Sequence, residues 1–151
     1  MTNITNEEYN TLMNYNKRFI DSTAILLPPS GDSRQRRFLQ SEDSLDEFIL
    51  DIDDGKGKIE LKIKYMTRHK SSNTILLRLD THGPIHQNPN GERIPTPHLH
   101  RYVDGYGDSW AEPLDPNIFH DCTDLAGLLN SFLELFNVTN IPQIIYQQTL
   151  I

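Results

Sequence analysis

The residues best suited to chemistry lie between positions 80 and 110, where four of the chain's six histidines fall within nineteen positions. His98 and His100 are separated by one residue, so in an extended strand both imidazoles point to the same face. Their Cα atoms would then lie about 6.5 Å apart, which allows both rings to reach one ion. Imidazole nitrogen is a preferred ligand of zinc, so this pattern predicts a zinc site.

Further ligands are available in the long segment 81–97 and directly before it. His86 is the natural third ligand, because its loop leaves the end of one expected strand and returns to the sheet at His98. Asp80 and His82 compete for the fourth position. In this hypothesis a single zinc ion fastens the long segment to the sheet and offsets the entropy lost on ordering it.

The identity of the fourth zinc ligand decides whether the site is catalytic or structural. If water fills that position, the ion could activate it for hydrolysis, with Glu92, Asp108 or Glu112 as the base. The protein would then be a hydrolase, such as a toxin-like nuclease. Acid–base chemistry on RNA by the histidines without a metal is a further alternative. If the protein supplies all four ligands, the site is structural.

The histidines must be positioned by a sheet, and the hydrophobic pattern predicts its strands. Thr5 followed by Glu8 is a capping-box pattern and starts a helix. Alternating apolar residues then indicate strands, separated by turns rich in Gly, Pro and Asn. The expected elements are a helix over 6–18 and strands at 19–27, 48–52, 59–65, 74–80, 98–103 and 110–114.

Two segments between these strands carry specific expectations. Asp54-Gly55-Lys56-Gly57 predicts a hairpin turn, across which Asp51 and Asp53 would meet the row of lysines on the following strand. Residues 68–73 are expected to form a polar loop. The seventeen residues 81–97 are dense in Pro, Gly and Asn, and we expect no regular element in them.

The C-terminal part predicts a second helix. Its apolar residues recur at helical spacing from Leu125 to Phe136, and Asp121 or Thr123 would cap its start. Residues 141–151 would add a short apolar closing segment with a helical turn. The expected fold is one α+β domain spanning residues 1–151, with an antiparallel sheet of five to six strands packed against an N-terminal and a C-terminal helix and a long metal-pinned loop.

Composition excludes several classes of protein. The net charge of −7 argues against direct binding of nucleic acid, which requires a positive surface. The single cysteine excludes an internal disulfide and fits a reducing cytoplasm. The polar N-terminus is unlike a signal peptide, and no apolar run is long enough to span a membrane.

The acidic charge instead favours partners with basic surfaces, because opposite fields speed encounter. From Tyr102 onward the sequence contains seven acids and no Lys or Arg. The residues expected to meet a partner are Asp104, Asp108, Glu112 and Asp115.

A resemblance rests on residues 83–91, on Pro97-His98-Leu99-His100-Arg101-Tyr102 and on Gly105 to Ala111. This pattern resembles a family of small, largely uncharacterised proteins of phages and Gram-positive bacteria, in which histidines recur at positions 86, 98 and 100. His82 departs from the pattern, which favours Asp80 as the shared ligand.

The chain is also similar in size, acidity and histidine layout to a zinc-containing phage anti-CRISPR protein that inhibits a type II effector nuclease. The resemblance implies a non-enzymatic inhibitor that docks on a CRISPR effector nuclease in the host cytoplasm and obstructs target DNA, with zinc holding its shape. The alternatives are the metal- or histidine-dependent hydrolase and a small interaction module without a metal.

Overall fold

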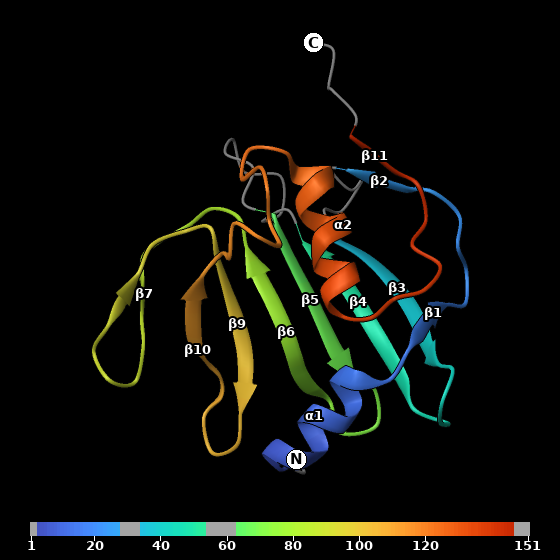
Figure 1. Ribbon diagram of the computed structural model, residues 1–151, viewed down its shortest axis with the longest axis horizontal. Helices are drawn as coiled ribbons and strands as arrows, with labels where there is room; N and C mark the ends of the chain where they lie inside the picture. The colour runs from blue at the N-terminus through green and yellow to red at the C-terminus, as the bar shows by residue number, and fades with distance from the viewer. Residues whose placement is uncertain (1–2, 28–33, 54–62, 147–151) are drawn as a thin grey trace.

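The centre of the molecule is a seven-stranded antiparallel sheet, seen in a computed structural model that describes residues 3–27, 34–53 and 63–146 (Figure 1). Its strand order is β1-β3-β4-β5-β6-β9-β10. The predicted α+β class with a helix near each end is confirmed, although the sheet has more strands than expected. The elements are α1 (Asn6–Asn14), β1 (Lys17–Phe19), β2 (Ile25–Leu27), β3 (Arg34–Ser41), β4 (Glu47–Asp53), β5 (Lys64–His69), β6 (Thr74–Asp80), β7 (His86–Gln87), β8 (Arg93–Ile94), β9 (His98–Val103), β10 (Gly107–Pro113), α2 (Leu125–Leu135) and β11 (Ile144–Tyr146).

Helix α1 begins with the predicted capping box. The Thr5 hydroxyl accepts from the Glu8 backbone N–H at 3.0 Å, and the Glu8 carboxylate accepts from the Thr5 backbone N–H at 3.1 Å. The helix ends at Asn14, earlier than predicted, because Tyr15 adopts an extended conformation. Lys17 therefore starts a strand and does not extend the helix.

The single strand predicted over 19–27 is wrong, since the chain forms β1 and β2 with a loop between them. The guanidinium of Arg37 explains this break. It donates to the backbone carbonyls of Thr23 and Ala24, both at 2.9 Å, and so holds the loop against the side of β3. These carbonyls consequently have a side-chain donor in place of a neighbouring strand.

Of the two acids predicted to meet the lysine row, Asp53 lies opposite Lys64, but the prediction for Asp51 is wrong. The Asp51 carboxylate accepts from Arg36 Nε at 2.8 Å and from Arg68 Nε at 3.1 Å, on the strands to either side. The turn and most of the lysine row fall in residues 54–62, outside the described residues. Strand β5 extends to His69, so the loop predicted from Arg68 begins two residues later.

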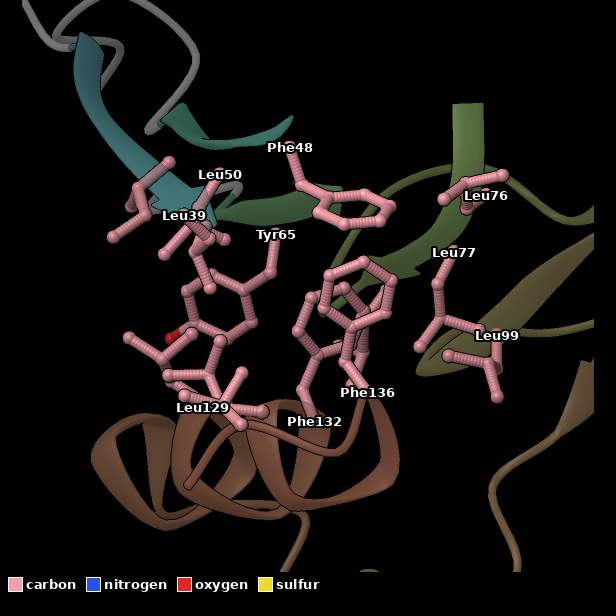
Figure 2. Close-up of a cluster of buried hydrophobic side chains, with 14 of the residues drawn as sticks. Leu39, Phe48, Leu50, Tyr65, Leu76, Leu77, Leu99, Leu129, Phe132 and Phe136 are labelled. Carbon is pink, nitrogen blue, oxygen red and sulfur yellow. The ribbon is translucent and has the colours of Figure 1, made fainter. Parts of the chain in front are cut away.

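The core lies between one face of the sheet and α2, which crosses that face (Figures 1 and 2). The predicted apolar stripe of α2 is confirmed. Phe136 meets Phe48 edge-on at 5.5 Å between ring centroids, and Phe132 lies 6.1 Å from Tyr65. The buried Tyr65 hydroxyl donates to the Leu125 carbonyl at 2.8 Å, which ties the sheet to the first turn of the helix.

Two details of the C-terminal part differ from the sequence-based expectation. The N-cap of α2 is Asp124, which accepts from the Gly127 N–H at 3.0 Å, whereas Asp121 binds the N–H of Thr123 in the preceding turn. Residues 144–146 form β11, parallel to β2, and not a helical turn. No helix among the described residues is long and apolar enough to cross a membrane.

The prediction that segment 81–97 contains no regular element is wrong. Strands β7 and β8 pair within it and form a small two-stranded ribbon beside β10 (Figure 1). The ribbon is short, and the remaining residues of the segment are irregular, as their Pro and Gly content predicts.

Candidate metal centre

Strands β6 and β9 are neighbours, and their register brings three potential ligands together. Asp80 lies opposite His98, and Arg78 lies opposite His100. Leu79 and Leu99, which lie opposite each other, point into the core. Their neighbours along the two strands therefore share the other face of the sheet. The i, i+2 spacing of His98 and His100 therefore places both imidazoles on one face of the sheet, as predicted.

The three side chains converge closely. Asp80 Oδ2 lies 3.2 Å from His98 Nε2 and 3.4 Å from His100 Nε2, and the two ring centroids are 4.8 Å apart. All three residues are buried, with exposed fractions of 7% for Asp80, 1% for His98 and 0% for His100. One ligand atom from each lies within 4.8 Å of the others, so this group can hold a metal ion.

Backbone carbonyls orient both rings. His98 Nδ1 lies 3.2 Å from the carbonyl oxygens of Ile94 and of Pro95, and His100 Nδ1 lies 2.8 Å from the carbonyl oxygen of Asp108. A carbonyl can only accept, so each Nδ1 must donate, and in a neutral ring Nε2 then carries the lone pair. With an ion bound, the two Nε2 lone pairs and the Asp80 carboxylate would all face it. With none bound, an Nε2 that carries a second proton can donate to Asp80.

Arg78 supplies a positive charge beside this group. Its guanidinium donates to both oxygens of Asp80, at 3.0 and 3.2 Å, and to Asp108 Oδ2 at 2.6 Å, and it lies 2.9 Å from His100 Nε2. Burial alone would raise the pKa of Asp80. The adjacent imidazoles of His100 and His98 and the charge of Arg78 outweigh burial and hold this pKa well below its usual range. Asp80 is therefore ionised, the form that binds a metal.

The structure places the other two predicted ligands differently. His86 packs against the pair, with its ring centroid 4.7 Å from that of His100, but it lies outside the group whose ligand atoms converge within 4.8 Å. Its Nε2 lies 2.6 Å from the carbonyl oxygen of Ser109, which leaves Nδ1 as its ligand atom. His82 is exposed, and its Nδ1 lies 3.0 Å from the Thr81 hydroxyl. Asp80, and not His82, thus joins the pair.

The three candidate bases lie in separate surroundings. The Asp108 carboxylate is bound by Arg78, and Glu112 forms an ion pair with Arg101 on the neighbouring strand. Glu92 is exposed and lies 3.4 Å from the amide nitrogen of Asn88.

The four acids predicted to meet a partner are divided between two environments. Asp108 and Glu112 are the two that arginines neutralise within the chain. Asp104 and Asp115 are exposed, at the turn after β9 and in the segment after β10. Asp115 also accepts from the N–H of Asn117 at 2.9 Å and so shapes a turn.

Sequence reasoning missed two residues, one in the centre and one that attaches segment 81–97 to β10. One is Arg78, whose alternation with Asp80 along β6 could have indicated a shared site. Asn88, which is 3% exposed and binds the backbone of β10, had no sequence pattern that distinguished it from the other asparagines of segment 81–97.

Comparison with known protein families gives one match. Residues 4–138 match a family of unknown function, DUF6978. The chain belongs to this family. The matched range includes every residue of the candidate centre, and the description of DUF6978 assigns that centre no role. No curated protein and no solved structure matches the chain.

Proposed function

We propose that this member of DUF6978 is a non-enzymatic, zinc-containing inhibitor that acts by binding a CRISPR effector nuclease in the host cytoplasm. The observation that carries the non-enzymatic part is the burial of the Asp80–His98–His100 group beneath the surface. The resemblance in size, acidity and histidine layout supports the choice of partner.

Burial argues for a structural ion. A catalytic zinc keeps one coordination position open to water and substrate. Here the two histidines are at most 1% exposed, and the positive charge of Arg78 lies against the carboxylate. A substrate would have to displace packed side chains to reach the ion. The hydrolase hypothesis lacks a comparable observation in its favour.

The donor set favours zinc as the ion. Two imidazole nitrogens and one carboxylate oxygen are ligands that zinc accepts in a tetrahedral site. His86 would be the fourth ligand through Nδ1, since its Nε2 is directed at Ser109 and its ring already packs against His100. The ion would then connect β6, β9 and the ribbon formed by β7 and β8, and so hold segment 81–97 in place.

Charge supports a partner that normally holds nucleic acid. The part of the chain after Tyr102 has seven acids and no Lys or Arg, and Asp104 and Asp115 are exposed there. An effector nuclease holds its guide–target duplex in a positively charged channel. An acidic protein is steered toward such a channel, and its binding should weaken as salt increases.

Two measurements test this proposal. Elemental analysis of purified, untagged protein should find about one zinc per chain, and target cleavage by a type II effector nuclease should decrease as the protein is titrated. The matched control is His82→Ala, which should retain both properties. Cleavage unaffected at saturating protein would overturn the inhibitor proposal, and turnover of RNA or DNA abolished by His98→Ala would establish the hydrolase in its place.

A further inference from the structure

A second polar cluster lies at the opposite end of β6 from Asp80, beside the turn that joins β5 to β6. His69, the last residue of β5, connects its members. Its Nε2 lies 2.7 Å from Asp46 Oδ1, and its Nδ1 lies 2.8 Å from the hydroxyl of Ser72. A carboxylate, an imidazole and a serine hydroxyl thus form a continuous chain of hydrogen bonds.

The carboxylate determines which nitrogen of His69 is basic. Asp46 is ionised and can only accept, so Nε2 of His69 carries the proton. Nδ1 then has the lone pair and faces the Ser72 hydroxyl, which donates to Thr74 Oγ1 at 2.9 Å and can rotate to donate to Nδ1 instead. This is the relationship that activates a serine, in which an oriented imidazole is ready to remove the hydroxyl proton.

The relay is held in place from several sides. The Ser44 hydroxyl donates to Asp46 Oδ2 at 2.7 Å. This hydrogen bond outweighs burial and, together with His69, lowers the pKa of Asp46, which keeps the carboxylate charged. The His69 ring is 8% exposed and packs 5.6 Å from the ring of Phe48. The imidazole is therefore ordered before any reagent arrives.

Two cavities reach the relay from outside. One of about 330 Å³ lies beside α1 and is lined by Asp46 and His69. The other, of about 400 Å³, is lined by Asp46, Lys70 and Ser71, the residue before the proposed nucleophile. Leu45, which is 95% exposed, adds an apolar wall to the second cavity. Glu47 also lines this cavity and pairs with the Lys70 ammonium at 2.9 Å, so the cavity suits an acyl compound with an uncharged alcohol as its leaving group.

We propose that Ser72 is an activated nucleophile that takes an acyl or phosphonyl group from a reactive electrophile. With an ester, a bond forms between the serine oxygen and the carbonyl carbon, and the hydroxyl proton passes to Nδ1 of His69. The bond to the leaving alcohol then breaks, and the alcohol takes that proton. Water, deprotonated by the same nitrogen, releases the acid and restores the serine. Asp46 acts as a positioning residue.

The test uses an alkyl fluorophosphonate carrying biotin, with the site of labelling located by peptide mass spectrometry. Attack by Ser72 forms an oxygen–phosphorus bond, and fluoride leaves. In the wild-type protein we expect one adduct, on Ser72. His69→Gln should slow labelling about 100-fold or more, the usual contribution of a general base, and Ser131→Ala, on α2, should leave the rate unchanged.

Two outcomes would overturn the proposal. One is wild-type protein that gains no adduct on Ser72 at reagent concentrations that label a serine hydrolase. The other is a labelling rate that stays the same in His69→Gln while circular dichroism shows the variant to be folded. Either result would mean that the hydrogen bonds only brace the turn. Since wild-type protein suffices for the first outcome, a variant that fails to fold does not prevent a decision.

Discussion

The side-chain amide of Asn88 binds both backbone polar groups of Ala111. It donates from Nδ2 to the carbonyl oxygen at 2.9 Å and accepts through Oδ1 from the N–H at 2.8 Å. Ala111 lies on β10, at the edge of the main sheet. The amide therefore makes the pair of bonds that a further strand would make, and His86 makes a similar contact with Ser109 two residues earlier. These bonds attach segment 81–97 to the sheet in addition to any ion that the candidate centre holds.

The first prediction concerns this attachment. Asn88→Ala should destabilise the protein by about 1–3 kcal/mol, because it leaves a buried N–H and a buried carbonyl of Ala111 without their partners. Limited proteolysis should cut segment 81–97 sooner, and chemical denaturation should give the loss of stability. Asn117→Ala, at an exposed position, is the matched control. Equal stability of the two variants would show that the amide bonds contribute little.

The second prediction concerns the ion. Removing zinc with a chelator should expose segment 81–97 to protease, and adding one equivalent back should restore protection. His98→Ala should behave like the chelated protein, whereas His82→Ala should retain zinc because its ring is exposed. Zinc-loaded and chelated protein with identical cleavage rates would show that an ion does not hold the segment.

The third prediction identifies the fourth ligand. Cobalt(II) bound in place of zinc should give the intense visible spectrum of a tetrahedral ion with nitrogen and oxygen ligands. His86→Ala should weaken cobalt binding by more than tenfold and change this spectrum, because water would replace an imidazole. His82→Ala serves again as the control. An unaltered spectrum in His86→Ala would exclude His86 from the coordination sphere.

The fourth prediction rests on the buried ammonium of Lys17. It is 0% exposed and donates to the carbonyl oxygens of Met13, Tyr15 and Phe136 at 2.8–3.0 Å. Burial lowers the pKa of Lys17 to about 7, although the charge of Asp43 opposes the shift. Between pH 7 and the usual lysine pKa of about 10.4, the unfolded chain binds more protons than the folded one.

Stability should therefore rise with pH over this window, by up to about 1.4 kcal/mol per pH unit from Lys17 alone. Below pH 7 Lys17 is protonated in both the folded and the unfolded chain, so the free-energy cost of burying its charge is fully present there. Lys17→Met removes this titration. The free energy of unfolding of the wild type should therefore rise relative to that of the variant from pH 7 to pH 9.5. Denaturant unfolding measures it. A constant difference would show that three carbonyl acceptors keep the lysine pKa near its normal value.

The fifth prediction tests the acidic surface. The double variant Asp104→Lys with Asp115→Lys should slow association with a type II effector nuclease and reduce its salt dependence, because both acids are exposed. Glu7→Lys with Glu42→Lys, at two exposed positions away from this surface, provides a control with the same charge change. Association rates equally reduced in both variants would mean that net charge, and not this surface, drives encounter.

The sequence predicted both helices and the strands β4, β6, β9 and β10 because their patterns are local. The alternation from His98 to Val103 defines β9 to the residue, and the Thr5–Glu8 capping box fixes the start of α1. The apolar stripe of α2 was also correct. Each of these depends on side chains within one or two turns or along one strand, where spacing alone decides which face a residue occupies.

Partners across the sheet were decided only by the tertiary structure. Asp51 meets two arginines because strand order and register place β3 and β5 beside it, and no spacing within the chain states this. The same reason brings Asp80 to His98, moves His82 to the surface and aligns Ser72 with Asp46 through His69. By itself the sequence determined which residues were available for metal or acid–base chemistry. The strand pairing determined which of them meet, because distances between strands depend on the packing of the whole core.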